Sequence, residues 1–340
     1  MKRTILYVVL AFIVAPIFVS CYQSHKKKLD LAYALVESRP DSALALMKHI
    51  DQEGLSKEEM AKYALTYYIA QDKSGLDLDN DSLIRIAYDW YEGHQEDSLY
   101  VLCLNYMGKF YLLVDSMEQA KSCLEKAYFI SDSLHKMNVK RLVLDMLIEV
   151  EEQLEPYKAL RYAKDMLKMY DSMANVTIYN KVAARLRLGE NFFYVGSLQH
   201  ALEEERKAYR MAMKAGDSNL LSYVRQNLAS TFEEMGEKDS CLYYARLAYD
   251  LNAANRFSCL LTFASAYISV DSLNQAFSLL NQALPKTAED RYSVFYFQSQ
   301  AAMKAQDFKS AKSFSDSAYH YLEDMYRTAL QGKAAYYTSF

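Results

Sequence analysis

The strongest constraint on the fold is a pattern of large and small residues that recurs along the chain at intervals of 35 to 42 residues. The unit that begins at Val101 carries the pattern at Leu104, Met107, Gly108, Tyr111, Ala120, Leu124 and Ala127. Two antiparallel helices approach closely only where small residues lie between them, and large residues pack above and below that point. The pattern therefore predicts a helical hairpin with Gly108 and Ala120 at its close contact and Ala127 where the next hairpin stacks.

The same frame returns in seven other units. The eight units start near residues 24, 64, 101, 140, 182, 222, 257 and 292. The best matches are 101–134, 182–215, 222–255 and 257–290, and the poorest is 140–181. In the unit that starts at Val182, Glu205 stands where the pattern has a large apolar residue. An irregular helical bundle is the alternative, but it has no reason to repeat small residues at the same offsets.

Composition favours helices over strands. The 340 residues include 9 Gly and 4 Pro, well below the usual usage of about 7% and about 5%. Tight hairpins between strands need residues that tolerate positive φ, chiefly Gly and Asn. The order of large and small residues resembles the tetratricopeptide repeat, which is about 34 residues long. This resemblance implies an all-α fold, a right-handed superhelical solenoid of about eight helical hairpins.

Polar residues mark several predicted helix starts. Asp41-Ser42, Asp81-Ser82 and Asp239-Ser240 each stand just before an apolar-periodic run. Side-chain oxygens at such positions can cap the free backbone amides of a new helix. Ser56 and Glu59 have the spacing of a capping box, which predicts the start of the first helix of the second hairpin.

The first twenty residues are interpreted as an export signal. A charged start, Met1-Lys2-Arg3, precedes an apolar stretch from Thr4 to Val19, which is shorter than the ~20 residues that a membrane span prefers. A serine followed by Cys21 closes the stretch and resembles the lipobox of bacterial lipoproteins, in which the cysteine is lipidated. Phe18 departs from the usual Leu, and the three lysines downstream oppose translocation. An uncleaved membrane helix and a cleaved signal without lipid are the alternatives.

Beyond Cys21 the chain resembles the tetratricopeptide-repeat lipoproteins of Bacteroidetes. Residues 29–46 resemble their opening hairpin and residues 80–88 their second. The resemblance implies four parts, namely a signal peptide at 1–20, a short basic tether at 21–28, a solenoid at 29–325 and a C-terminal capping or connecting helix at 326–340. No acidic residue directly follows Cys21. In this family that absence favours a lipid anchor in the outer membrane that faces the periplasm over surface export.

The first helix of each hairpin in such arrays lines a concave groove. The residues expected there are Asn105, Lys109, Arg187, Glu190, Tyr194, Tyr223, Gln226, Asn227, Tyr296 and Gln300. This lining is polar and aromatic, which suits an extended peptide or a partner helix. We therefore expect a protein or peptide partner.

Signatures of catalysis, metal binding and nucleic-acid binding are not found in the sequence. The six histidines are never paired at metal-ligand spacing, and no glycine-rich phosphate loop or nucleophile elbow occurs. The net charge is −4, without a broad basic face. The carboxylate runs at 203–205 and 149–152 are interpreted as solvated helix faces. We expect no enzyme activity, and no metal or cofactor apart from the covalent lipid on Cys21.

The remaining four cysteines leave one question open. Cys241 occupies a small-residue position of the repeat, which predicts a buried thiol. In an exported protein Cys103 could form a disulfide with Cys123, or Cys241 with Cys259.

Three function classes fit these observations. The first is a membrane-anchored interaction scaffold that holds a peptide or partner protein in the groove. The second is the sensor half of a signalling system, whose membrane-spanning output part is a separate protein. The third is a glycan-binding lipoprotein, although the chain has little room for the large insertions of that class.

Overall fold

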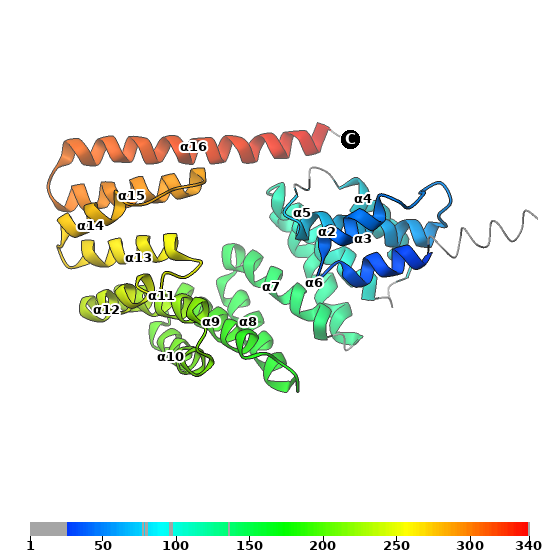
Figure 1. Ribbon diagram of the computed structural model, residues 1–340, viewed down its shortest axis with the longest axis horizontal. Helices are drawn as coiled ribbons and strands as arrows, with labels where there is room; N and C mark the ends of the chain where they lie inside the picture. The colour runs from blue at the N-terminus through cyan, green and yellow to red at the C-terminus, as the bar shows by residue number, and fades with distance from the viewer. Residues whose placement is uncertain (1–25, 77, 79–80, 95–97, 135–136, 339–340) are drawn as a thin grey trace, which may run out of the picture. The chain divides into compact units, whose positions relative to one another are not determined.

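The computed structural model describes residues 26–76, 78, 81–94, 98–134 and 137–338. The expected signal peptide, Cys21 and most of the tether lie outside this part of the chain. All regular structure in the described ranges is helical, and the helices follow one another in eight pairs (Figure 1). The prediction of an all-α fold of about eight hairpins is therefore confirmed. The chain divides into two compact units between Met146 and Leu147.

The first compact unit, which ends at Met146 and is distinct from the sequence repeats above, holds three hairpins and the start of a fourth. It begins with a helix at residues 26–35. The following helices are α2 (Pro40–Met47), α3 (Lys57–Lys73), α4 (Ser82–Tyr91), α5 (Ser98–Leu113), α6 (Met117–Ser133) and the first part of α7 (Met137–Leu154). Tyr68, Tyr100 and Phe110 are among its largest fully buried side chains. The tyrosines of this unit thus contribute to the packing between helices.

The second unit continues from α7 to the end of the described chain. Its helices are α8 (Pro156–Ser172), α9 (Ile178–Tyr194), α10 (Leu198–Ala215), α11 (Ser218–Glu234), α12 (Lys238–Tyr249), α13 (Arg256–Ser269), α14 (Leu273–Leu280), α15 (Ala288–Lys304) and α16 (Phe308–Thr338). One apolar cluster extends from Val182 to Leu280 through three successive hairpins. Successive hairpins therefore share a continuous core, as stacked repeats do.

The close contact inside a hairpin includes a large residue of the second helix. A Cβ atom added to Gly108 would lie 2.7 Å from Cγ of Leu124, so Leu124 packs directly on this glycine. In the second unit Gly189 has the same relation to Glu205, whose Cγ would be 3.1 Å from an added Cβ. The backbone oxygen of Ala201, the residue equivalent to Ala120, would be 3.5 Å from the same Cβ. The glycine therefore makes room for the large residue of the partner helix as well as for the small one.

Five hairpin turns share one backbone feature. In each of them, one residue between the two helices has positive φ, and these residues are Asp115, Gly196, Gly236, Asp271 and Gln306. All five stand at the same offset from the assigned unit starts. In the poorly matching unit, Pro156 begins α8 directly after α7 instead. The left-handed residue is therefore part of the repeat, and the 140–181 unit departs from it.

Helix capping follows the prediction in part. Ser56 and Glu59 form the expected capping box of α3. Asp81 is the N-cap residue of α4, as predicted, but its side chain pairs with Arg85 and does not cap the helix. Asp41 and Asp239 are not caps, because they lie inside the first turns of α2 and α12. Side-chain caps that were not foreseen start three helices, at Thr177, Asp217 and Thr287.

The last helix is longer than the others. The 31-residue α16 lies alongside α15 and then runs on past it (Figure 1). The expected connecting helix at 326–340 is thus, up to Thr338, a continuation of the last hairpin. Across the described ranges, no helix is both long enough and apolar enough to traverse a bilayer.

Candidate functional site

The ten expected groove residues are divided between the two units. Asn105 and Lys109 lie on α5 in the first unit, and the other eight lie on α9, α11 and α15 in the second. Asn105 is 5% exposed, so it belongs to the packing between helices. Lys109 forms a 2.5 Å ion pair with Asp72 of α3. The second unit therefore carries most of the expected groove.

Hydrogen bonds join the first helices of successive hairpins in the second unit. Asn191 of α9 donates to Glu152 of α7, and Asn227 of α11 donates to Glu190 of α9, each across 2.9 Å. Arg187 lies between the two carboxylates, 3.6 Å from Glu152 and 3.7 Å from Glu190. The bonded residues are 39 and 37 positions apart, about one repeat. Each bond therefore joins a first-helix residue to a position three residues later in the frame of the preceding hairpin.

The same kind of contact continues from α11 to α13. Gln226 donates to Ser258 and accepts from Asn255 across 3.0 Å. Ser265 donates to Glu233 across 2.7 Å. Four expected groove residues therefore also hold adjacent hairpins together, namely Arg187, Glu190, Gln226 and Asn227.

A pocket of about 190 Å³ opens between α9 and α11. We call it the α9–α11 pocket, and its lining residues are Tyr179, Ala183, Leu186, Arg187, Glu190, Leu220, Tyr223 and Asn227. Tyrosine and apolar side chains line it near the starts of the two helices, and charged or amide side chains line it further along. The structure thus brings together four of the expected groove residues, Arg187, Glu190, Tyr223 and Asn227.

The other four lining residues were missed from the sequence. Ala183 and Leu186 lie on α9 in the same frame as Arg187 and Glu190, so the frame itself carried the signal for them. Tyr179 precedes the assigned unit start at 182, since α9 begins four residues before it. Leu220 is missed for the same reason, because α11 begins before the assigned start at 222.

Two exposed tyrosines line this pocket. Tyr179 is 54% exposed and Tyr223 is 45% exposed, although both line the pocket. Tyr194 and Tyr296 are also exposed, as is Gln300, but none of these three lines the α9–α11 pocket. The pocket therefore has tyrosine walls that a ligand can contact.

The charge beside the pocket is predominantly negative. Burial raises the pKa of Glu152, Arg187 opposes this effect, and the carboxylates of Glu190 and Glu149 raise the pKa further. Arg187 is thus shared by two carboxylates, Glu152 and Glu190, so an added positive charge would be stabilised beside them.

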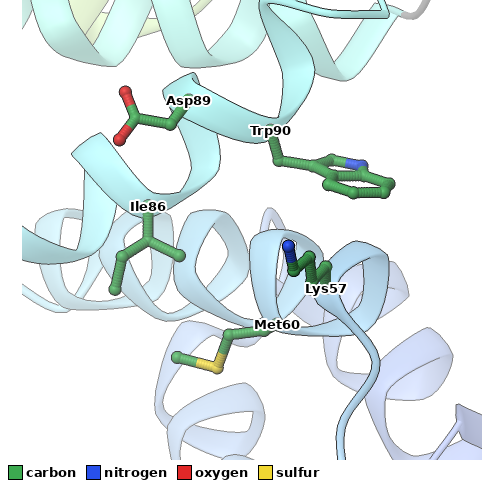
Figure 2. A pocket seen from close by; sticks show the side chains of 5 residues that line it. All are labelled: Lys57, Met60, Ile86, Asp89 and Trp90. Atoms are coloured by element: carbon green, nitrogen blue, oxygen red, sulfur yellow. The ribbon is translucent and has the colours of Figure 1, made fainter.

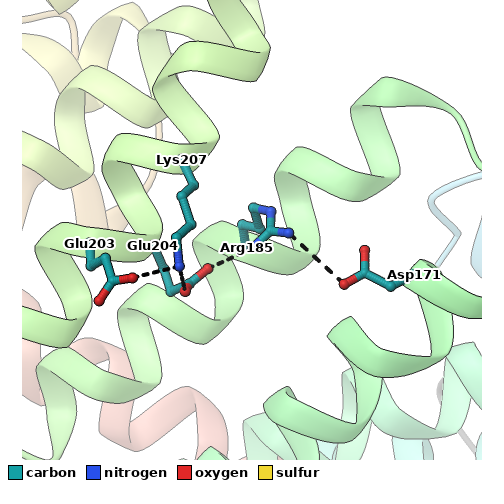
Figure 3. A network of polar contacts seen from close by, with 5 residues as sticks. All are labelled: Asp171, Arg185, Glu203, Glu204 and Lys207. Atoms are coloured by element: carbon teal, nitrogen blue, oxygen red, sulfur yellow. Dashed lines mark hydrogen bonds and ion pairs between the residues drawn. The ribbon is translucent and has the colours of Figure 1, made fainter.

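The three consecutive glutamates of α10 differ in environment, which corrects their interpretation as a solvated face. Glu203 is exposed and pairs with Lys207 across 2.7 Å. Glu204 is largely buried between Lys207 and Arg185, at 2.7 Å and 2.8 Å (Figure 3). Glu205 is 1% exposed. Only the first of the three fits the expected description.

Glu205 lies in the packing between α9, α10 and α11. Thr231 of α11 donates to its carboxyl group across 2.7 Å. Burial raises the pKa of Glu205 to about 7, the Thr231 hydrogen bond opposes this, and the Glu190 carboxylate adds to it. Glu205 stands against Gly189 as Leu124 stands against Gly108. A titratable group therefore occupies an apolar position of the repeat.

The second carboxylate run, on α7, is also not a uniform solvated face. Glu149 is exposed, whereas Glu151 is fully buried and lies 3.2 Å from the Lys158 ammonium group. Glu152 is partly buried and accepts the bond from Asn191 described above. Two of these glutamates are therefore structural contacts.

Cys103, Cys123, Cys241 and Cys259 are thiols, so neither possible disulfide is formed in this structure. Cys241 is buried as predicted, and burial raises the pKa of its thiol to about 12. Within the ranges that the structure describes, no group of His, Cys, Asp and Glu side chains is arranged to hold a metal ion.

A second hollow lies in the first unit, between α3 and α4. Its volume is about 380 Å³. Figure 2 shows Lys57 and Met60 on α3 facing the side of α4 that carries Ile86, Asp89 and Trp90. Its lining has one charge of each sign, as the lining of the α9–α11 pocket does.

Comparison with known proteins identifies the fold. No protein-family model matches the sequence, and no curated protein matches it. The apo form of RapI superposes with a TM-score of 0.67 at 14% identity, over 88% of this chain and 86% of that one. Aspartyl phosphate phosphatase F from Bacillus subtilis gives 0.57 at 15% identity, over 93% and 92%. NprR in complex with its cognate peptide NprX gives 0.59 at 15% identity, over 85% and 86%. The chain therefore has the fold of tetratricopeptide-like helical-repeat proteins.

Proposed function

We propose that this protein is a non-catalytic scaffold that holds a peptide or partner protein against the first helices of its second unit. The α9–α11 pocket is the observation that carries the proposal, because it combines an apolar floor, exposed tyrosines and fixed polar groups. Binding sites of this kind use apolar contacts for affinity and a few placed polar groups for orientation.

Two structural relatives add support. One is a Rap protein solved in complex with competence and sporulation factor, and the other is NprR solved with its cognate peptide. Both share the fold of this chain over most of their length. A fold of this type can thus hold a peptide, and the proposal assigns that role to this chain.

We further propose that the scaffold is a lipoprotein anchored through Cys21 to the outer membrane, facing the periplasm. The support is the sequence pattern of a charged start, an apolar stretch and a small residue before Cys21. Several buried acyl chains would anchor such a protein firmly. In cells, Cys21→Ala should accumulate as an unprocessed precursor without lipid. Normal processing and membrane fractionation of this variant would refute the anchor.

The binding role is tested by site-specific crosslinking in cells. A photo-crosslinking amino acid at Tyr223, inside the pocket, should capture one or a few defined protein or peptide partners. The matched control is the same replacement at Tyr243, an even more exposed tyrosine on α12 that does not line the pocket. Identical capture at both positions, or none at Tyr223, would contradict the proposed function.

A further inference from the structure

We infer that the α9–α11 pocket binds a peptide segment that pairs one large apolar side chain with a nearby lysine or arginine. This inference rests on the proposed function and adds the chemistry of the partner. It depends on three observations, namely the size of the pocket, the excess of carboxylates beside it and the distance between its two ends.

The pocket as a whole has room for about one large side chain. Its total volume, polar part included, is about 190 Å³, whereas pockets for drug-sized ligands begin at roughly 300 Å³. A cavity of about 150 Å³ accommodates benzene. Ala183 leaves the space open on the α9 side, and Leu186 and Leu220 form a floor that is largely buried. One leucine- or phenylalanine-sized side chain therefore fits, with Tyr179 and Tyr223 at its sides.

The polar half favours a cation. Glu190 lines the pocket together with Arg187, and this guanidinium is shared with a second carboxylate, since it lies 3.6 Å from Glu152 and 3.7 Å from Glu190. Glu152 also lies within the last turn of α7. Helix carboxyl ends carry partial negative charge, which adds to the attraction for a lysine or arginine. An acidic segment would instead meet two or more carboxylates for each favourable contact with Arg187.

The carboxylates are held in place before any ligand arrives. Asn227 donates to Oε1 of Glu190, and Asn191 donates to Oε1 of Glu152. An ionised carboxylate accepts at about four lone-pair positions, so each retains capacity for a further donor. Because these amides fix the acceptors, a bound ammonium or guanidinium group loses less free energy to ordering of its partners.

The spacing of the two halves predicts the spacing in the ligand. Leu186 precedes Glu190 by four residues and Ala183 precedes it by seven, which corresponds to about 6 Å and about 10 Å along a helix. An extended peptide advances about 3.3 Å per residue. The basic residue is therefore expected about two or three positions from the apolar one.

A peptide array probed with the full chain tests the inference. Bound peptides should be enriched in lysine or arginine two or three positions from Leu, Ile or Phe, and depleted in Asp and Glu. Glu190→Gln keeps an acceptor for Asn227 but removes the charge, and should weaken binding of the basic peptides about fivefold. Ala183→Phe fills the apolar half and should weaken it about tenfold or more.

Two matched variants separate recognition from folding. Glu203→Gln removes an exposed carboxylate of α10, and Ala215→Phe adds the same ring to an exposed alanine at the end of α10. Both should bind the selected peptides as the unmodified chain does. Equal weakening by Glu203→Gln and Glu190→Gln would overturn the inference, since bulk charge would then explain the effect.

The outcomes also separate this inference from the function on which it rests. Enrichment of acidic or uncharged peptides would overturn the basic ligand but leave a peptide-binding scaffold. Crosslinking of a partner at Tyr223 without any selected peptide motif would do the same. Failure of both the array and the crosslinking would refute the inference together with the proposed function.

Discussion

Replacing Glu205 by leucine should stabilise the protein at neutral and alkaline pH and should do so less, or not at all, in mild acid. Leu124 already packs on Gly108 in the equivalent position of the first unit. Leucine at 205 therefore has a structural precedent in the same chain, and it removes a buried group whose charged form is disfavoured.

The magnitude follows from the pKa of the buried carboxyl group. Burial raises the pKa of Glu205 from 4.5 to about 7, and each pKa unit corresponds to about 1.36 kcal/mol. The folded chain binds the proton more tightly than the unfolded chain does, so the contribution of this proton to stability is complete below the unfolded pKa. It decreases as pH rises from about 4.5 to about 7, by about 3 kcal/mol in total. Glu205→Leu removes this dependence.

Urea unfolding followed by far-UV circular dichroism measures the effect at a series of pH values. The difference in unfolding free energy between Glu205→Leu and the unmodified chain should grow by about 3 kcal/mol from pH ~4.5 to above pH ~7, because the other groups cancel in the difference. Hydrogen exchange of α9, α10 and α11 localises the change, since repeat arrays do not always unfold in one step.

Two variants control for size and for surface charge. Glu205→Gln removes the charge at nearly constant volume and should show the same pH trend, with a smaller gain because its amide lacks the fit of leucine. Glu203→Leu changes an exposed residue of the same helix and should show no such trend. A Glu205→Leu difference that stays constant across this pH range would show that the buried carboxyl group does not titrate as argued.

Two further substitutions test the hairpin geometry. Gly108→Ala places a Cβ atom 2.7 Å from Leu124 and should lower the unfolding free energy of the first compact unit by about 1–3 kcal/mol. The control is Gly93→Ala, where the nearest atom would be 3.6 Å away, and it should have a much smaller effect in the same denaturation assay. Gln306→Gly relieves a left-handed residue with φ of 62° and should raise the thermal midpoint by an amount equivalent to about 1 kcal/mol, whereas Ala305→Gly beside it should lower the midpoint. A reversal within either pair would contradict the geometric explanation.

The hairpins could be predicted from the sequence because their determinants are local and repeated. Residues such as Gly108 and Leu124, or Ala264 and Leu280, lie at constant offsets and are all buried. Helix caps were less predictable, since Asp41 and Asp239 are suitable residue types that the structure places one or two positions inside the helix. Residue preference identifies a helix start to within a turn but does not identify the capping residue.

The sequence predicts on which helices the candidate site residues lie, but it does not predict which residues they contact. The repeat frame places Glu190 and Asn227 on the first helices, yet it does not show that they bond to each other across hairpins. Glu205 was misinterpreted because it belongs to a run of three glutamates, and only its position in the frame distinguished it from Glu203. The pairing of a groove residue is a property of the neighbouring repeat, about forty positions away, so local composition does not reveal it.

The bonds between first helices also restrict how a repeat protein of this kind can evolve. Glu190 and Asn227 line the pocket and at the same time connect two hairpins, so under the proposed function mutations there should change partner preference and stability together. Tyr179 and Tyr223 line the same pocket while remaining about half exposed. Relatives that bind other partners should therefore differ at the two tyrosines and retain the glutamate–asparagine pair. The tyrosine walls of the pocket would then be the part of this surface that can change without loss of the contacts between hairpins.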